Sequence, residues 1–290
     1  MQQLLFDQVR HVKPLRTQLL KWIGNKQRFA HEIVSYFPAD FNRYHEPFLG
    51  SGAVLATLRH KTASASDIFP SLVEIWRALH DSPDTLKDWY SERWKQVAQG
   101  EKVKEYEAIK ASYNKSPNGA DLLFLCRSCY GGVVRFRKAD GYMSTPCGVH
   151  APIHPDKFAK RVDIWHERTR GTDFSVMDYQ DAMPRAKEGD LIYCDPPYSH
   201  SQGILYGAQS FDIRELFEII SHCKKSGVYV ALSIDGKKMS GRKVCELSIP
   251  DDLFERQIFV NCGPSMLKRF QMQGRNLDEH HVADRLLLTY

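Results

Sequence analysis

Apolar and polar positions alternate along the chain in two blocks, and the first block covers its N-terminal third. Residues Asn25 to Tyr36 and Pro70 to His80 carry apolar side chains at helical spacing. Tyr44 to Phe48 is a short apolar run that predicts a strand, and Gly50 to Arg59 predicts a helix that opens after Gly-Ser-Gly. This alternation predicts a parallel sheet with crossover helices.

The second block resumes the same alternation towards the C-terminus. It predicts a helix at Asp212 to Lys225 and strands at Asp173 to Met177, Asp190 to Cys194, Gly227 to Ile234, Gln257 to Asn261 and Arg285 to Tyr290. Between the blocks, from about Ser82 to His154, helical segments rich in Lys, Glu, Trp and Tyr precede a stretch rich in Gly and Arg. We therefore expect an α/β fold with an insertion, and ligands of such sheets bind at the carboxyl ends of strands.

Composition narrows the class of protein. A chain of 290 residues with 42% hydrophobic residues can bury a large core and suits one domain with an insertion. No stretch approaches the ~18 apolar residues of a membrane span, and the N-terminus lacks a signal-peptide pattern, so we expect a cytoplasmic protein without a membrane partner. The 40 Lys and Arg exceed the 35 Asp and Glu by five, which is compatible with a phosphate-backbone partner.

Seven cysteines without an export signal predict reduced thiols. Cys126 and Cys129, separated by two residues, are followed by Cys147 and His150 at a spacing found in zinc ribbons. However, Cys126 and Cys129 lie in an apolar run, residues 121–130, that predicts a helix, whereas zinc ribbons place such pairs on tight turns. We expect packed thiols here, with a zinc site as the alternative.

The tetrapeptide Asp195-Pro196-Pro197-Tyr198 follows the apolar run of residues 191–194 and carries the most informative chemistry. The exocyclic amine of adenine or cytosine is a poor nucleophile because its lone pair is delocalised into the ring. Asp195 and the Pro196 carbonyl can each accept one N–H and localise that lone pair, while the prolines stiffen the turn. Tyr198 offers a ring on which an extruded base can stack. An ordinary proline turn after a strand is the alternative.

Three further features suit a nucleoside ligand. Glycines in Glu46-Pro-Phe-Leu-Gly-Ser-Gly52 lie where a strand turns into a helix and would let a ligand approach the backbone, although this motif in isolation favours a tight turn without a ligand. Asp67 follows the next strand and can bind both ribose hydroxyls, or cap the helix at Pro70. Asp178, after a third strand, can reach an adenine amino group, or be an exposed loop acid.

These motifs, together with Lys21-Trp22-Ile23-Gly24-Asn25-Lys26 and in this order, make the chain resemble the Dam-like (D12) class of DNA adenine-N6 methyltransferases over nearly its whole length. The resemblance implies a Rossmann-like, S-adenosylmethionine-dependent methyltransferase fold. Its discontinuous catalytic domain would comprise residues 1–82 and 165–290. Residues 83–164 would form an inserted, mostly helical target-recognition domain that carries a β-hairpin.

The resemblance also implies roles for individual residues. The cofactor S-adenosylmethionine, whose product is S-adenosylhomocysteine, would be bound by Lys21, Trp22, Gly24, Lys26, Glu46, Pro47, Phe48, Gly50, Gly52, Asp67, Asp178 and Asp195. The residues Asp195, Pro196, Pro197 and Tyr198 would hold the flipped adenine. No metal is expected, because the sulfonium of the cofactor already makes the methyl group electrophilic.

Double-stranded DNA is the expected partner, and the predicted contacts lie in and around the hairpin. They are Arg127, Arg135, Arg137, Lys138, Tyr142 and Ser144. Arg135 and Arg137 flank Phe136 in period-two alternation, so on a strand both could read guanine from one face, or simply contact phosphates or solvent. A second basic segment, Ser265 to Arg275, could contact the flanking backbone.

Two alternatives to adenine methylation are retained. Cytosine-N4 methylation uses the same chemistry, although family members of that kind more often carry Ser in place of Asp195. A sequence-specific DNA-binding regulator without turnover is the alternative from another class. We expect a monomer, with a cognate restriction endonuclease as a candidate partner, and the recognised DNA sequence is not predicted.

Overall fold

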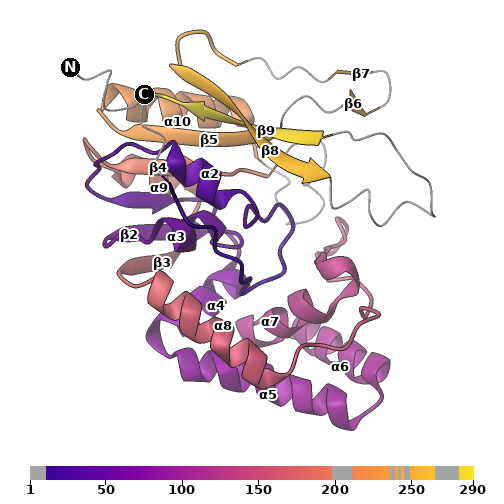
Figure 1. Cartoon of the computed structure of the whole chain (residues 1–290). Helices are drawn as coiled ribbons and strands as arrows, with labels where there is room; N and C mark the ends of the chain where they lie inside the picture. Colours follow the sequence, from indigo (N-terminus) through magenta and orange to yellow (C-terminus); the bar gives the residue numbers. More distant parts are fainter. Residues whose placement is uncertain (1–10, 198–210, 236–238, 241–242, 245–248, 265–280) are drawn as a thin grey trace.

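A computed structural model describes residues 11–197, 211–235, 239–240, 243–244, 249–264 and 281–290. Seven strands form one sheet in the order β3-β2-β1-β4-β5-β9-β8 (Figure 1). Their bounds are β1 Tyr44–Glu46, β2 Ala63–Asp67, β3 Thr172–Val176, β4 Leu191–Cys194, β5 Tyr229–Asp235, β8 Arg256–Pro264 and β9 His281–Leu288. The short strands β6 (Met239–Ser240) and β7 (Lys243–Val244) form a separate two-stranded sheet.

The predicted parallel sheet is correct for β1 to β5 and wrong for the C-terminal strands. Strand β9 runs antiparallel to both of its neighbours, β5 and β8. Alternation with a period of two is the same in either direction, so the sequence pattern could not distinguish the two arrangements. From β1 the chain proceeds outward to β2 and β3, then returns with β4 beside β1. This reversal creates a topological switch point between β1 and β4.

Apolar packing covers both faces of the sheet. Along β4, Leu191 and Tyr193 belong to one buried cluster, whereas Ile192 and Cys194 belong to another. Successive side chains of a strand point to opposite faces, so the two clusters lie on opposite sides of the sheet. This explains why β4 is a continuous apolar run rather than an alternating one.

Five helices accompany the sheet, namely α2 Ala30–Ser35, α3 Ala53–Leu58, α4 Pro70–Asp81, α9 Tyr179–Ala182 and α10 Ile213–Lys225. The predicted helix that should begin at Asn25 begins only at Ala30, because turns follow the positive-φ residue Gly24. Across the described ranges, no helix combines the length and apolar character that a membrane crossing needs. The predicted Rossmann-like α/β architecture is confirmed.

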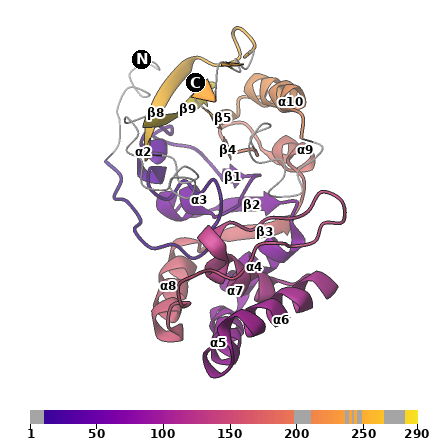
Figure 2. The same cartoon turned by 90° about the vertical axis from the view of Figure 1, so that its right-hand side faces the viewer.

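The insertion lies between β2 and β3, as predicted. It contains α5 Pro83–Gln99, α6 Lys102–Lys115, α7 Gly119–Ser128, the short 3₁₀ turn η1 Tyr130–Gly132, and α8 Pro155–Arg168. In both views α5, α6 and α7 gather beyond the β3 edge of the sheet, opposite β8 (Figures 1 and 2). The predicted boundary at 82/83 coincides with the junction of α4 and α5. The boundary at 164/165 falls inside α8.

The insertion shares its core with the sheet. Trp76 of α4 packs against Trp165 of α8, with ring centroids 5.7 Å apart, and stacks on Phe174 of β3 at the same separation. Phe124 of α7 belongs to the same continuous cluster as Tyr44 of β1. Apolar burial is therefore continuous across the predicted domain boundary.

Candidate functional site

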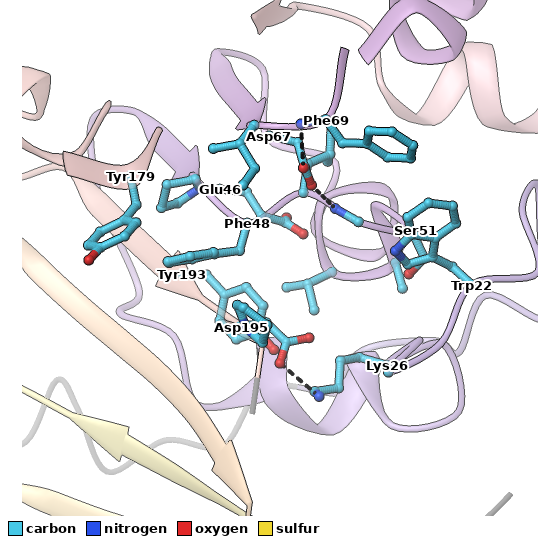
Figure 3. Close-up of a pocket in the computed structure, with 18 of the residues that line it drawn as sticks. Trp22, Lys26, Glu46, Phe48, Ser51, Asp67, Phe69, Tyr179, Tyr193 and Asp195 are labelled. Carbon is cyan, nitrogen blue, oxygen red and sulfur yellow. Dashed lines mark hydrogen bonds and ion pairs between the residues drawn. The ribbon is translucent and has the colours of Figure 1, made fainter. Parts of the chain in front are cut away.

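A pocket of about 350 Å³ opens at the switch point of the sheet (Figure 3). The carboxyl ends of β1, β2 and β4 contribute Glu46, Asp67 and Asp195 to its lining. The N-terminal segment adds Trp22 and Lys26. Residues from three strand ends and a distant segment thus converge where open α/β sheets bind ligands.

The turn after β1 brings the backbone close to this pocket. Gly50 and Gly52 have φ angles of 46° and 60°, which favour glycine. A Cβ atom at Gly52 would lie 2.7 Å from the ring of Trp76, whose Nε1 donates to the Gly50 carbonyl at 3.2 Å. A Cβ atom at Gly50 would lie 3.3 Å from Trp22. The two indole rings therefore hold the predicted strand-to-helix turn from either side.

Asp67 links the ends of β1 and β2. Its carboxylate accepts the Gly50 N–H at 3.0 Å and the Phe69 N–H at 3.1 Å. Burial raises the pKa of Asp67 to about 6, although these backbone hydrogen bonds oppose the shift. Each oxygen retains a lone pair for a further donor, so the fixed carboxylate can also accept hydrogen bonds from a ligand in the pocket.

Asp195 forms an ion pair at the end of β4. The Lys26 Nζ lies 2.8 Å from its Oδ1, and the Lys26 side chain is only 4% exposed (Figure 3). Lys26 is a predicted cofactor contact and lines the pocket. The structure also places its ammonium group on the predicted catalytic carboxylate, where it can fix the orientation of that carboxylate.

Glu46 is a second acid next to Asp195. It is buried and accepts a hydrogen bond from the Tyr44 hydroxyl at 2.7 Å. Burial, together with the negative charge of Asp195, raises the pKa of Glu46 to about 8 against the hydrogen bond from Tyr44. The environment of Glu46 therefore favours its protonated form beside the ion-paired Asp195.

An aromatic wall closes one side of the pocket. Phe48 stacks on Tyr179 with ring centroids 5.1 Å apart, and Phe211 meets Phe48 edge-on at 6.0 Å. The Tyr193 hydroxyl shares a hydrogen bond of 2.9 Å with Ser233. Tyr179, Phe211 and Tyr193 are not among the site residues that the sequence predicts. The position of Tyr179 directly after the predicted strand-end acid was a usable signal, whereas nothing in the sequence linked Phe211 to this site.

Most of the predicted cofactor and catalytic residues converge on the pocket, namely Trp22, Gly24, Lys26, Glu46, Pro47, Phe48, Gly50, Asp67, Asp178, Asp195 and Pro197. Asp178 also caps α9 by accepting the Gln180 N–H at 3.1 Å. Of the described residues, Lys21, Gly52 and Pro196 are not part of the lining. Lys21 is exposed, with its side chain beside Gly132. Tyr198 lies outside the described residues, as does the basic segment 265–275.

The predicted hairpin is present between α7 and α8. Phe136 pairs antiparallel with Met143, and the Ser144 N–H donates to the Arg135 carbonyl at 2.9 Å. Arg135, Arg137 and Ser144 are exposed, whereas Phe136 is half-buried. The two arginines thus alternate with an inward-packed ring, in the period-two arrangement that the sequence predicts.

The tip of the hairpin is stabilised by its own side chains. Arg137 makes a two-pronged contact with Asp140, with its Nε donating at 3.0 Å and its Nη2 at 2.5 Å. The same guanidinium lies over the Tyr142 ring, 4.3 Å from the centroid. Lys138 is exposed beside it. Arg137 and Tyr142 therefore fix the shape of the tip, and Arg135 and Lys138 present positive charge outward.

The structure buries Arg127, which the sequence predicts to contact DNA. It is 5% exposed, and its Nη1 donates to the carbonyls of Gln18 at 3.2 Å and Leu19 at 2.6 Å. Its guanidinium also lies 5.3 Å from the centroid of the Phe158 ring. A side chain so enclosed cannot contact DNA in this conformation. Arg127 instead ties the N-terminal segment to the insertion, because α7 directs it inward.

The four residues with zinc-like spacing do not converge. Cys126 lies on α7 and Cys129 directly follows it, and both are buried. Burial raises the pKa of each of these two thiols to about 12. Within the described part of the chain, no group of three or more His, Cys, Asp and Glu side chains is placed to hold a metal ion.

The fold and the pocket define an α/β protein with a ligand site at its switch point, and comparison with known proteins shows its family. The sequence profile of the D12 class N6 adenine-specific DNA methyltransferases matches residues 22–256. The chain therefore belongs to the D12 class of N6 adenine-specific DNA methyltransferases, as its motifs predict.

Individual relatives are more distant. The DNA adenine methylase of Vibrio cholerae is 26% identical over 189 residues, which cover 62% of this chain and 64% of that protein. A Type II methyltransferase of Lactococcus lactis is 25% identical over 232 residues, covering 73% of this chain and 79% of its own. The DNA N-6-adenine-methyltransferase of Escherichia phage P1 is 24% identical over 242 residues, or 78% of this chain and 31% of the phage protein.

The chain thus spans slightly less than two thirds of the Vibrio relative's length. Among solved structures, the rRNA methyltransferase aviRa from Streptomyces viridochromogenes matches with a TM-score of 0.32 and 11% identity, covering 90% of this chain and 83% of that chain.

Proposed function

We propose that this protein transfers a methyl group from S-adenosylmethionine to N6 of an adenine that is flipped out of double-stranded DNA. The observation that carries the proposal is the position of Asp195, whose carboxylate lies at the end of β4, in the pocket at the switch point. Membership of the D12 family supports adenine as the methylated base.

The pocket fits the proposed cofactor. A volume of about 350 Å³ suits a nucleoside with a short polar tail. Asp67 presents a fixed carboxylate for ribose hydroxyls, and the wall of Phe48, Tyr179 and Phe211 offers apolar faces to a purine. When bound, S-adenosylmethionine supplies an electrophilic methyl group on a sulfonium.

The chain's own residues would prepare the nucleophile. The Asp195 carboxylate accepts one hydrogen of the adenine amino group, and the Pro196 carbonyl accepts the other, which localises the lone pair on nitrogen. Lys26 holds Asp195 through the ion pair of 2.8 Å, so the carboxylate keeps its direction during the reaction. Tyr198 completes the proposed tetrapeptide as a stacking platform.

The hairpin is the proposed DNA contact. Arg135, Lys138 and Ser144 are exposed there and can contact phosphates or base edges. Arg137 and Tyr142 would contribute by shaping the tip, and Arg127 is excluded by its burial. The proposal further includes a monomeric enzyme, with a cognate restriction endonuclease as a candidate partner, because one relative is a Type II methyltransferase.

Radiolabelled methyl transfer to unmethylated plasmid DNA tests the proposal. The wild-type protein should incorporate label, and nucleoside analysis should identify N6-methyladenine. Asp195→Asn should lower kcat on the order of 10²-fold or more, because the neutral amide is a weaker acceptor. Asp84→Asn removes a carboxylate that is 86% exposed on α5 and should retain full activity.

Each other result has a defined meaning. N4-methylcytosine as the product would replace the adenine assignment with the cytosine alternative. Specific DNA binding without incorporation would favour a regulator, and an active Asp195→Asn protein would exclude the proposed mechanism. Long-read sequencing of DNA from expressing cells would then identify the methylated base and its sequence context.

A further inference from the structure

Two cysteines face each other across the base of the hairpin. Cys129 and Cys147 form an isolated antiparallel bridge. The N–H group after Cys129 donates to the carbonyl before Cys147, and the N–H group after Cys147 donates to the carbonyl before Cys129, both at 2.8 Å. These flanking bonds identify a non-hydrogen-bonded pair, in which opposite Cα atoms are ~4.5 Å apart. Disulfides accept Cα separations of ~4.4–6.8 Å.

Neighbouring residues hold the two strands together at this level. A Cβ atom at Gly148 would lie 2.7 Å from the Ser128 carbonyl oxygen, so only glycine permits the approach. The buried Tyr106 hydroxyl donates to the Thr145 carbonyl at 2.9 Å. The backbone separation required by a disulfide is therefore already built into the folded protein.

We infer that Cys129 and Cys147 form an oxidation site, at which a small-molecule disulfide produces an intrachain bond that closes the base of the hairpin. Both thiols are free in this structure. The Cys129 Sγ points to the Cys126 carbonyl at 3.9 Å, and the Cys147 Sγ to the Gly148 carbonyl at 3.6 Å. Bond formation therefore needs rotation about the side-chain torsions, with the backbone in place.

The exposure of the two thiols sets the order of the reaction. Cys147 is half-buried, whereas Cys129 is only 4% exposed. Cys147 loses its proton to solvent and attacks the small disulfide, which gives a mixed disulfide and releases one thiol. Cys129 then loses its proton and attacks the Cys147 sulfur, which releases the second thiol. Two cysteine thiols are oxidised, and one small disulfide is reduced to two thiols.

Treatment of the native protein with oxidised glutathione tests the inference. Because burial raises the pKa of both thiols, the incubation should be mildly alkaline. Free thiols are then blocked, and non-reducing peptide mapping should find Cys129 joined to Cys147. Trypsin can cut after the exposed Arg135 or Lys138. The nicked, oxidised protein should migrate as one chain until it is reduced, and its melting temperature should be higher than that of the reduced form.

Two variants control the assignment. Cys126→Ser removes the neighbouring thiol and should leave the crosslink intact, whereas Cys147→Ser should abolish it. A crosslink that involves Cys126 would overturn the inference, as would accumulation of glutathione on Cys147 without closure, or no crosslink at all. Wild-type mapping decides the matter even if a variant folds poorly. The test requires no methyl transfer, so it is independent of the proposed function.

Discussion

At the scale of single residues, the pocket separates its acids by environment. Asp195 is paired with Lys26, Asp67 accepts two backbone N–H groups, and Glu46 is buried with a hydroxyl donor. In each of these three carboxyl groups, a different interaction thus offsets the free-energy cost of burial. Their predicted responses to substitution and to pH differ accordingly.

Lys26→Met should lower the rate of methyl transfer more than it lowers cofactor affinity. Methionine keeps much of the side-chain volume but removes the ammonium group that lies 2.8 Å from Asp195. A misdirected carboxylate can reduce turnover on the order of 10²-fold. Steady-state kinetics and cofactor titration would separate the two effects. An equal loss in both would show that Lys26 mainly serves the cofactor.

Glu46→Gln should stabilise the protein above about pH 8. The pKa of Glu46 rises from 4.5 to about 8 on folding, chiefly through burial. Between these values the unfolded chain releases a proton that the folded protein retains, so the free energy of unfolding falls as pH rises. Glutamine cannot ionise, and a pKa shift from 4.5 to about 8 corresponds to a gain on the order of 5 kcal/mol over wild type above that interval. Below pH 4.5 the two proteins should converge.

Thermal unfolding measured across this pH range checks the prediction. A stability difference between Glu46→Gln and wild type that is independent of pH would show that Glu46 does not titrate as its environment implies. A wild-type protein that is more stable than Glu46→Gln at high pH, and that loses this advantage as the pH falls, would indicate a lowered pKa.

At the scale of elements, the hairpin combines a fixed scaffold with exposed charge. Phe136 packs edge-on against Phe69, with ring centroids 5.5 Å apart, and thereby joins the hairpin to the segment that precedes α4. The ring centroid of Phe69 in turn lies 6.2 Å from that of Trp22, which lines the pocket. Three aromatic rings therefore form a chain of contacts from the hairpin to the pocket.

Arg135→Ala should weaken DNA binding and reduce its dependence on salt. Arg135 is exposed and projects from the hairpin, so its loss removes one potential phosphate or base contact. If it contacts a phosphate, the slope of log affinity against log salt should fall by about one. Fluorescence anisotropy at several salt concentrations measures this slope.

The matched control is Arg170→Ala, which removes an exposed arginine in the turn that follows α8. It should leave DNA affinity unchanged. An Arg135→Ala protein that keeps the wild-type affinity and slope would exclude this residue from the interface.

At the scale of the whole molecule, one apolar cluster runs from the sheet into the insertion. Trp76 and Trp165 meet within it, and Phe124 of α7 packs against Tyr90 of α5 at 5.7 Å between centroids. The insertion therefore lacks the separate core that would let it fold alone.

We predict that the described sheet and insertion unfold together in a single transition. Differential scanning calorimetry should give a calorimetric enthalpy close to the van't Hoff enthalpy. Deletion of residues 83–164 should prevent folding, since it exposes the apolar face of α4. Two resolved transitions, or a folded deletion protein, would contradict a shared core.

The sequence alone predicted the candidate chemistry and determined the order of the elements. The sequence predicted Asp195 after an apolar run, the glycines after β1 and Asp67 after β2. Strands and turns depend on neighbouring residues, so their ends can be located from the local sequence. The change in composition after residue 82 indicated the insertion, and the family resemblance added its hairpin and its expected role. These features depend on short stretches of chain, which is why they could be predicted.

Tertiary structure alone decided which side chains meet. Lys26 lies on Asp195, Arg127 points inward and Phe211 completes the aromatic wall. The reversed direction of β9 and the continuous core across the insertion were likewise not predictable. Each of these depends on contacts between segments distant in the sequence, and neither periodicity nor residue type specifies which distant surface a side chain will face.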